Sequence, residues 1–452
     1  MRVAKTSLAV AAALLWTATE AANIQRTPAP KVVGMTTQRR AISDPLGHDR
    51  LRRRGTVEST LSNQETLYFT NMTIGTPPQM LRLHLDTGSS DLWVNSAGSR
   101  LCELANRPCN FAGTYAANKS STYEYVNSVF NISYVDGSGA SGDYVSDVLT
   151  IGTTSVDRMQ FGVGYNSTSA QGILGLGYEL NEVQVNRAGL KPYRNLPTKL
   201  VEQGAISSPA YSLWLNDVAA TTGNILFGGV DTEKFQGPLY TLPIQQNGGV
   251  FAEFLVTLTS VQYTGGAGQS AQVMGDNMAL AVLLDSGSSL TYLPDDMVQR
   301  IYKAVGAQFD SNEGAAYVPC SLADDRTRML NFTFSSPATI TVPMSEMVLE
   351  LVTASGRRPT FRSGGSACLF GLASSGKGTN VLGDTFLRSA YVVYDLENNE
   401  VSLAQSRLNA ARSNIVEIRK GRAAVPGAMA VPNPHCIVWR LQGRKGRRRD
   451  RN

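Results

Sequence analysis

Histidine is the scarcest functional residue type of this chain. Three histidines occur in 452 residues, and only His84 falls between residues 55 and 406. Serine and cysteine proteases need a histidine base, so neither kind of site is expected. His84 alternates with Asp86 along a strand-like run and is expected to be structural. No His-Glu-x-x-His motif or comparable ligand set occurs, so the sequence predicts neither a metal nor another cofactor.

Long apolar runs are missing too. Residues 8–16 form a short apolar core behind Arg2 and Lys5, and the small residues Ala21 and Ala22 follow. This is the pattern of a secretory signal peptide, here residues 1–22. No other stretch approaches the length of a transmembrane helix. The product is therefore expected to be secreted, either extracellular or associated with the cell wall or cell surface.

Cysteine is rare, with five residues, a number that fits disulfides in a secreted protein better than a metal site. The sequence also has five Asn-x-Ser/Thr sequons, which secretion would expose to glycosylation. These candidates are Asn71, Asn118, Asn131, Asn166 and Asn331.

The formal net charge of +5 combines three different segments. Residues 1–54 carry +7, residues 55–406 carry −12, and residues 407–452 carry +10. The central segment 55–406, which is expected to carry the function, is thus acidic, and a nucleic-acid partner is not expected. The basic segment 407–452 is expected to be a disordered tail; binding to an acidic wall polymer or to lipid headgroups is the alternative.

From Glu65 to about residue 406 the chain alternates short runs rich in Val, Ile, Tyr and Thr with Gly and Asn. This pattern indicates strands. Helical signals are few: an apolar periodicity that begins after Pro294, and residues 197–203, which end at Gly204. A mostly antiparallel β fold follows.

One short motif occurs twice. A single Asp-Thr-Gly would be an ordinary Asx-type turn after a strand, but both copies follow strand-like runs and both precede an apolar-apolar-Gly triplet. Such a repeat predicts two similar lobes that each contribute one carboxylate to a shared site. The motifs are Asp86-Thr87-Gly88-Ser89-Ser90 with Ile173-Leu174-Gly175, and Asp285-Ser286-Gly287-Ser288-Ser289 with Val381-Leu382-Gly383.

Over residues 65–406 the chain resembles the pepsin-like aspartic proteases, most closely their fungal yapsin and candidapepsin branch. The resemblance rests on the two Asp motifs, on the extension of the first through Trp93, on Tyr134-Val135-Asp136-Gly137-Ser138, and on residues 381–387. It implies a bilobal, mostly β fold with the active site in the cleft between the lobes. The implied division is a pro-segment 23–54, an N-terminal lobe 55–240 and a C-terminal lobe 241–406.

The resemblance assigns roles to the two motifs. Asp86 and Asp285 would be catalytic. The other residues would support them: Thr87 and Ser286 by bonding across the two loops, Ser89 and Ser288 by donating to the outer carboxylate oxygens, and Gly88 and Gly287 by admitting the substrate backbone.

Tyr134 would lie on a flap that closes over the substrate, with its hydroxyl reaching the indole of Trp93. Asp136 and Ser138 belong to the same flap. Asp136 is expected to pair with a basic substrate residue before the cut, although an exposed turn aspartate is the alternative. Val135 departs from the glycine of many relatives.

The resemblance also implies disulfides Cys102–Cys109 and Cys320–Cys368, and leaves Cys436 over. Residues 23–54 end in Arg52-Arg53-Arg54, where a protease that cuts after paired basic residues would release the pro-segment. A disordered linker is the alternative reading. Lys31 is a candidate partner of the aspartates in the zymogen. The tail also lacks the hydrophobic anchor signal found in yapsin-like relatives.

The predicted protein is a secreted, monomeric aspartic-type endopeptidase, made as a zymogen and active at acidic pH. Two Asp carboxylates would activate a water to hydrolyse protein or peptide substrates, and pepstatin-type compounds would inhibit it. The alternative is a catalytically silent, secreted peptide-binding glycoprotein of the same fold. The intact pair of Asp loops favours the enzyme.

Overall fold

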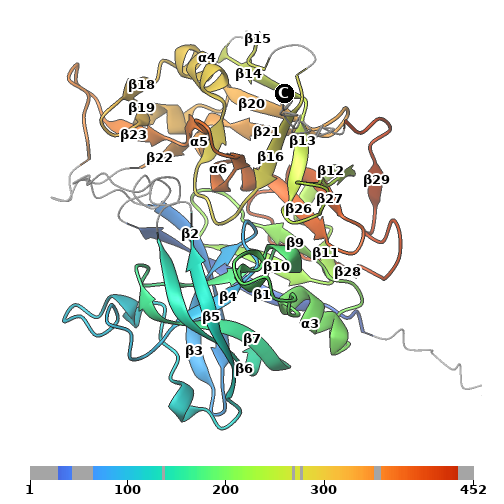
Figure 1. The fold of residues 1–452 in the computed structure, drawn as a ribbon. Helices are drawn as coiled ribbons and strands as arrows, with labels where there is room; N and C mark the ends of the chain where they lie inside the picture. Colours follow the sequence, from blue (N-terminus) through green and yellow to red (C-terminus); the bar gives the residue numbers. More distant parts are fainter. Residues whose placement is uncertain are drawn as a thin grey trace, which may run out of the picture. The chain divides into compact units, whose positions relative to one another are not determined.

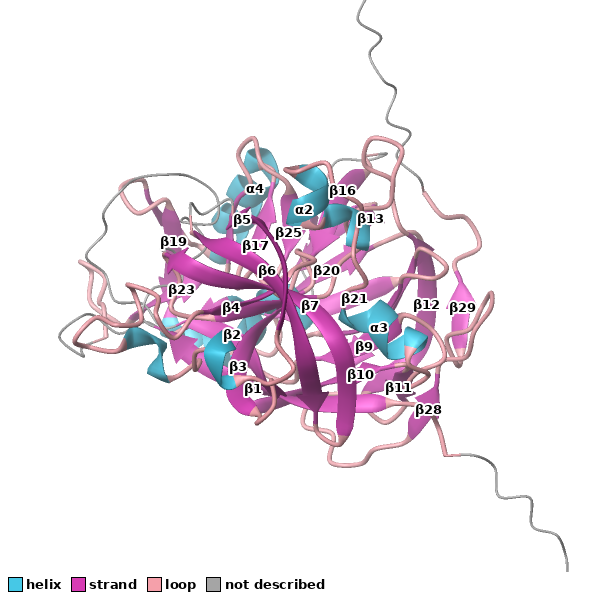
Figure 2. Ribbon diagram, turned by 60° about the horizontal axis from the view of Figure 1, so that its bottom comes forward, coloured by secondary structure: helices cyan, strands magenta, loops and turns pink. Residues whose placement is uncertain are grey.

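The computed structural model describes residues 29–42, 65–134, 138–266, 270–274, 278–350 and 358–435. Apart from Ala29 and Pro30, these residues belong to one unit of the chain, Lys31–Asn452. Strands dominate this unit (Figure 2), which confirms the predicted mostly β fold. Within the described residues, no helix is long and apolar enough to cross a membrane.

The largest sheet has 14 strands. In spatial order they are β29 (Ala428–Ala430), β12 (Phe235–Pro243), β27 (Glu400–Ser406), β26 (Ala390–Asp395), β9 (Ala210–Trp214), β10 (Thr222–Phe227), β1 (Val33–Ile42), β2 (Glu65–Ile74), β3 (Gln79–Asp86), β8 (Gly172–Gly175), β4 (Leu92–Asn95), β7 (Thr154–Ser167), β6 (Gly139–Ile151) and β5 (Glu124–Ser133).

Four smaller sheets complete the strand structure of the described residues. They are β11 (Gly229–Asp231) with β28 (Ile415–Glu417); β13 (Leu255–Leu258), β16 (Leu280–Leu284), β25 (Asn380–Leu382), β17 (Thr291–Leu293) and β24 (Leu372–Ser374); β15 (Ser270–Gln272), β14 (Ser260–Thr264), β20 (Met329–Thr333) and β21 (Thr339–Pro343); and β18 (Gln308–Asp310), β19 (Ala315–Pro319), β23 (Ala367–Phe370) and β22 (Val348–Leu349).

Helices are short. They are α2 (Val183–Asn186), α3 (Leu196–Glu202), α4 (Asp295–Val305), α5 (Met344–Met347) and α6 (Asp384–Leu387), with 3₁₀ turns η1 (Pro108–Asn110), η2 (Ala117–Lys119), η3 (Glu179–Asn181) and η5 (Cys320–Asp324). The two predicted helices are α3 and α4. In α4, two aspartates occupy the first turn, the periodic apolar side chains are buried, and Gly306 ends the helix at φ 70°, a conformation that glycine adopts without strain.

The two Asp motifs follow strands in the two halves of the chain, β3 in the lower and β16 in the upper part of Figure 1, and the same strand pattern surrounds both. β3 runs parallel to β8 and places Asp86 opposite Gly175. β16 runs parallel to β25 and places Leu284, the residue before Asp285, opposite Leu382. Each Asp therefore emerges at the end of a buried strand, beside the apolar-apolar-Gly triplet of its own lobe.

Strand β1 comes from the expected pro-segment and lies between β10 and β2 in the large sheet. Its side chains alternate as a strand should, with Val33, Met35 and Thr37 buried. Lys31, just before it, is exposed and makes no ion pair with any described residue. The expectation that Lys31 pairs with the aspartates is therefore wrong.

The tail expected to be disordered is ordered over residues 407–435, so that prediction is wrong for this part. Residues 436–452, Cys436 included, lie outside the described residues. We call residues 407–435 the C-terminal strap. β28 of the strap pairs with β11, β29 runs parallel to β12, and the His435 amide donates to Ser335 Oγ at 3.0 Å.

Isolated apolar side chains hold the strap in place. Ile418 and Val425 are buried in a cluster with Trp214, Leu239 and Tyr391. Val431 is buried as well, in the main core cluster. Because these residues follow no period, the sequence pattern did not reveal them.

A buried carboxylate anchors the start of the strap. Asp231 is 1% exposed and accepts hydrogen bonds from Ser413 Oγ (2.6 Å) and from the Asn414 amide (2.8 Å). Without the strap this carboxylate would lose these two donors and keep the Glu233 amide, which donates to its Oδ1 at 3.1 Å. The strap therefore compensates a charge as well as covering apolar surface.

Truncation after Ser406 is expected to lower the free energy of unfolding by about 3–6 kcal/mol. Burial of Ile418 and Val425 is worth about 1.5–3 kcal/mol each, and Asp231 loses two of its donors in addition. Chemical denaturation of the truncated and full-length chains would measure the difference. Truncation after His435 is the control and should retain full stability; equal midpoints for the two truncations would contradict the prediction.

Candidate active site

The two Asp loops have the same local geometry. Asp86 Oδ1 accepts from the Gly88 amide at 2.8 Å, and Asp86 Oδ2 from Ser89 Oγ at 2.6 Å. In the second loop the same oxygens of Asp285 accept from the Gly287 amide at 2.8 Å and from a serine hydroxyl, that of Ser288, at 2.7 Å. Both carboxylates are buried, at 0% and 6% exposure.

Thr87 and Ser286 join the two loops by reciprocal hydrogen bonds. Thr87 Oγ1 donates to the Leu284 carbonyl (2.9 Å) and accepts from the Ser286 amide (3.0 Å). In return, Ser286 Oγ donates to the Leu85 carbonyl (3.0 Å) and accepts from the Thr87 amide (3.2 Å). All four of these hydrogen bonds are buried, so they hold the two loops in a fixed position relative to each other.

The loops also bring the two carboxylates close. A Cβ atom added to Gly88 would lie 2.5 Å from Asp285 Oδ1, so only glycine fits at this position. The same Gly88 binds Asp86 through its amide. Gly88 therefore lies against both carboxylates, Asp86 through its amide and Asp285 through its Cα.

The predicted flap is the hairpin of β5 and β6. The Trp93 indole donates to Tyr134 Oη at 2.7 Å, and the Tyr134 amide donates to the Ser138 carbonyl at 2.8 Å. Residues 135–137 at the tip lie outside the described residues. The role of Asp136 therefore stays a prediction.

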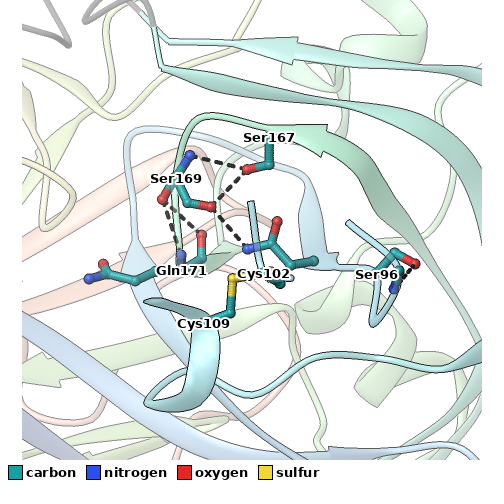
Figure 3. Close-up of a disulfide and its surroundings, with 8 residues drawn as sticks. Ser96, Cys102, Cys109, Ser167, Ser169 and Gln171 are labelled. Carbon is teal, nitrogen blue, oxygen red and sulfur yellow. Dashed lines mark hydrogen bonds between the residues drawn. A yellow bond between two sulfur atoms is a disulfide. The ribbon is translucent and has the colours of Figure 1, made fainter. Parts of the chain in front are cut away.

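The structure also describes the four cysteines of the predicted disulfides and the histidine His84. Both predicted disulfides, Cys102–Cys109 and Cys320–Cys368, are present, and Figure 3 shows the first with the serine-rich turn Ser167–Gln171 near it. His84 is buried in β3, its ring 5.8 Å from that of Phe69. Among the described residues no group of three His, Cys, Asp or Glu could hold a metal.

The five sequons differ in exposure. Four of the asparagines are exposed, whereas Asn331 is half-buried. Asn331 also donates to Thr264 Oγ1 (3.2 Å) and accepts from Thr341 Oγ1 (2.8 Å) across the sheet. A glycan would have to be attached at Asn331 Nδ2, which is half-buried and already donates to Thr264, so Asn331 is the poorest candidate. The exposed four are Asn71, Asn118, Asn131 and Asn166.

A family model for eukaryotic aspartyl proteases matches residues 67–406. The chain belongs to this family. It is 53% identical over 422 residues to the probable aspartic-type endopeptidase opsB of Aspergillus oryzae, covering 93% of this chain and 85% of that protein. It is 38% identical over 374 residues to candidapepsin-3 of Candida albicans, with 81% and 86% covered.

The fold resembles the crystal structure of an aspartic proteinase from Irpex lacteus, with a TM-score of 0.62, 22% identity, and 85% of this chain and 99% of that one covered. The chain is thus an aspartic-type endopeptidase of the pepsin-like fungal branch with a bilobal fold. The strap lies beyond the matched residues 67–406.

Sequence reasoning missed a second pair of buried acids near the flap, Asp91 and Glu182. Asp91 lies in the extension of the first motif through Trp93, to which the sequence assigns no role, and only its place before an apolar run could have drawn attention to it. Burial raises the pKa of Asp91, against hydrogen bonds from Tyr144, Val183 and Tyr193 that lower it.

Glu182 is fully buried, and this burial raises its pKa to about 10, against a hydrogen bond from the Tyr193 amide (2.8 Å) that lowers it. The nearby Asp91 and Glu179 charges raise it further. Glu182 is therefore protonated in the folded protein at acidic and neutral pH.

Glu182 should make the protein less stable as the pH rises. The folded state keeps this proton to about pH 10, whereas an unfolded glutamate releases it near pH 4.5. The free energy of unfolding should therefore fall above pH 4.5, by up to about 1.4 kcal/mol per pH unit from this group. Glu182→Gln should flatten that slope between pH 5 and 7, as measured by chemical denaturation.

The matched control is Glu103→Gln, which changes an exposed glutamate and should keep the wild-type slope. A Glu182→Gln protein with an unchanged slope would show that the buried acid is not the cause.

Proposed function

We propose that this chain is a secreted endopeptidase in which Asp86 and Asp285 activate a water to cleave peptide bonds at acidic pH. The observation that carries the proposal is the pair of equivalent, buried carboxylates in loops joined by reciprocal hydrogen bonds. A shared proton keeps one carboxylate ionised and the other protonated over an acidic range.

Each carboxyl group then has one task. The ionised carboxylate takes a proton from the water as its oxygen attacks the scissile carbonyl carbon. The protonated one donates a hydrogen bond to the carbonyl oxygen and stabilises the charge that develops there. When the C–N bond breaks, the leaving amine receives a proton and the other product is the new carboxyl terminus. Water is the only co-reactant.

Asp86→Asn and Asp285→Asn should each lower kcat/KM by about 10²-fold to 10⁴-fold or more, because either change removes a proton-transfer group of the pair. Asp296→Asn, at an exposed position of α4, is the control and should retain activity. Peptide hydrolysis at acidic pH by folded variants is the measurement. Near-normal turnover of either dyad variant would reject the assignment.

Secretion and zymogen formation are part of the proposal. Residues 1–22 have the signal-peptide pattern, and a Candida relative is named a secreted aspartic protease. The pro-segment 23–54 carries a net +6 against −12 for residues 55–406. Attraction between them should hold the precursor closed near neutral pH and weaken as carboxylates gain protons.

Activation should expose a new N-terminus at Gly55, after the triple arginine. Because β1 occupies the place between β10 and β2, it must either stay bound as a separate peptide or be replaced by another strand. N-terminal sequencing and intact mass of the acid-activated form would decide. An active species whose chain still begins before residue 54 would refute the pro-segment.

A preference for substrates with Lys or Arg before the cut is proposed for Asp136. A basic side chain that reached a partly shielded carboxylate would gain a charge-assisted hydrogen bond of about 1.5–3 kcal/mol, or about tenfold to a hundredfold in kcat/KM. Asp136→Thr should remove this preference and leave cleavage after Leu intact. Matched Lys and Leu peptides would test it, and an unchanged ratio would make Asp136 a simple turn residue.

A further inference from the structure

Asp91, five residues after Asp86, is 1% exposed and gathers three hydrogen bonds. Its Oδ1 accepts from Tyr144 Oη at 2.5 Å and from Tyr193 Oη at 3.1 Å, and its Oδ2 accepts from the Val183 amide at 2.9 Å. The donors are two phenols and a backbone amide, and none of them is charged.

Burying a carboxylate without a cation is costly unless its oxygens are satisfied. Three converging donors satisfy Asp91, and no neutral side chain of this size accepts on both ends. Asparagine would turn its N–H group either toward the Val183 amide, which cannot accept, or toward the two phenols, which would then have to accept instead of donate. Asp91 is therefore well suited to hold together the three chain segments that carry these donors.

Those segments lead directly to the flap. Tyr144 lies on β6, the second strand of the flap hairpin, whereas Val183 begins α2 and Tyr193 lies in the loop before α3. Asp91 itself precedes β4, which carries Trp93. One carboxylate thus ties the chain just after the Asp86 loop to a flap strand.

Aromatic packing continues the connection. Phe130, on the first flap strand, lies with its ring centroid 5.2 Å from Tyr144 and 6.4 Å from Trp93, and Tyr144 lies 5.7 Å from Tyr193. The Trp93 indole then holds the hydroxyl of the flap residue Tyr134. All five aromatic residues pack in one cluster.

We propose that Asp91 is a positioning residue that fixes the flap relative to the Asp86 loop, acting through Tyr144 and the Trp93–Tyr134 bond. The inference rests on the proposed dyad and flap. The function of Asp91 is to keep the flap in the position that binds substrate, so its loss should weaken binding more than it slows the chemical step.

Tyr144→Phe and Tyr193→Phe form a matched pair, because each removes one phenol from the same Asp91 oxygen, but only Tyr144 lies on a flap strand. Tyr144→Phe should raise KM and the pepstatin dissociation constant about tenfold, with kcat within about twofold of wild type. Tyr193→Phe should leave these constants within about twofold, even where it lowers the thermal midpoint. Asp91→Asn, which keeps a weaker acceptor, should give a KM between those of wild type and Tyr144→Phe.

A merely structural Asp91 would give two Tyr variants with lower thermal midpoints and wild-type KM, and that result would overturn the proposal. Equal KM increases in both Tyr variants, or a wild-type KM in Asp91→Asn, would overturn it as well. Asp86→Asn is measured alongside: if that variant retains activity, the dyad itself is wrong, whereas an inactive Asp86→Asn with unaffected Tyr144→Phe rejects only the role of Asp91.

Discussion

The reciprocal hydrogen bonds between Thr87 and Ser286 are the contact on which the site depends. Each hydroxyl donates to a strand carbonyl of the opposite half and accepts from the amide of its counterpart. Only a small side chain with one donor and free acceptor capacity can do both. The contact fixes the ends of β3 and β16 against each other, and the spacing of the two carboxylates follows from it.

The dyad could be predicted because its chemistry is local in sequence. Five consecutive residues supply each carboxylate, its amide donor and its hydroxyl donor. Because this motif occurs twice in the sequence, a second loop of the same kind could be predicted. Strand composition likewise predicted the β fold, and apolar periodicity with proline and glycine boundaries predicted the two longer helices. The Asp91 cluster could not be found this way, since its partners lie 53, 92 and 102 residues along the chain and nothing near Asp91 signals them.

The C-terminal strap escaped prediction for a different reason. The expectation of disorder rested on the net charge of +10 over residues 407–452, because strongly charged segments cannot usually bury enough apolar surface to order themselves. Here the body of the protein supplies the apolar surface, and single residues of the strap, Ile418, Val425 and Val431, are buried against it. The strap is ordered because of the surface against which it packs, and the sequence of the tail alone does not reveal that surface.

The strap also decides where anything joined directly after residue 435 will begin. A chain that stopped with β27 would present its terminus beside β12. The strap instead carries the backbone to Ser335, between β20 and β21 of the second half. A label or linker joined directly after His435 would therefore start from that hairpin, and a tether at this point would hold the enzyme by its second half.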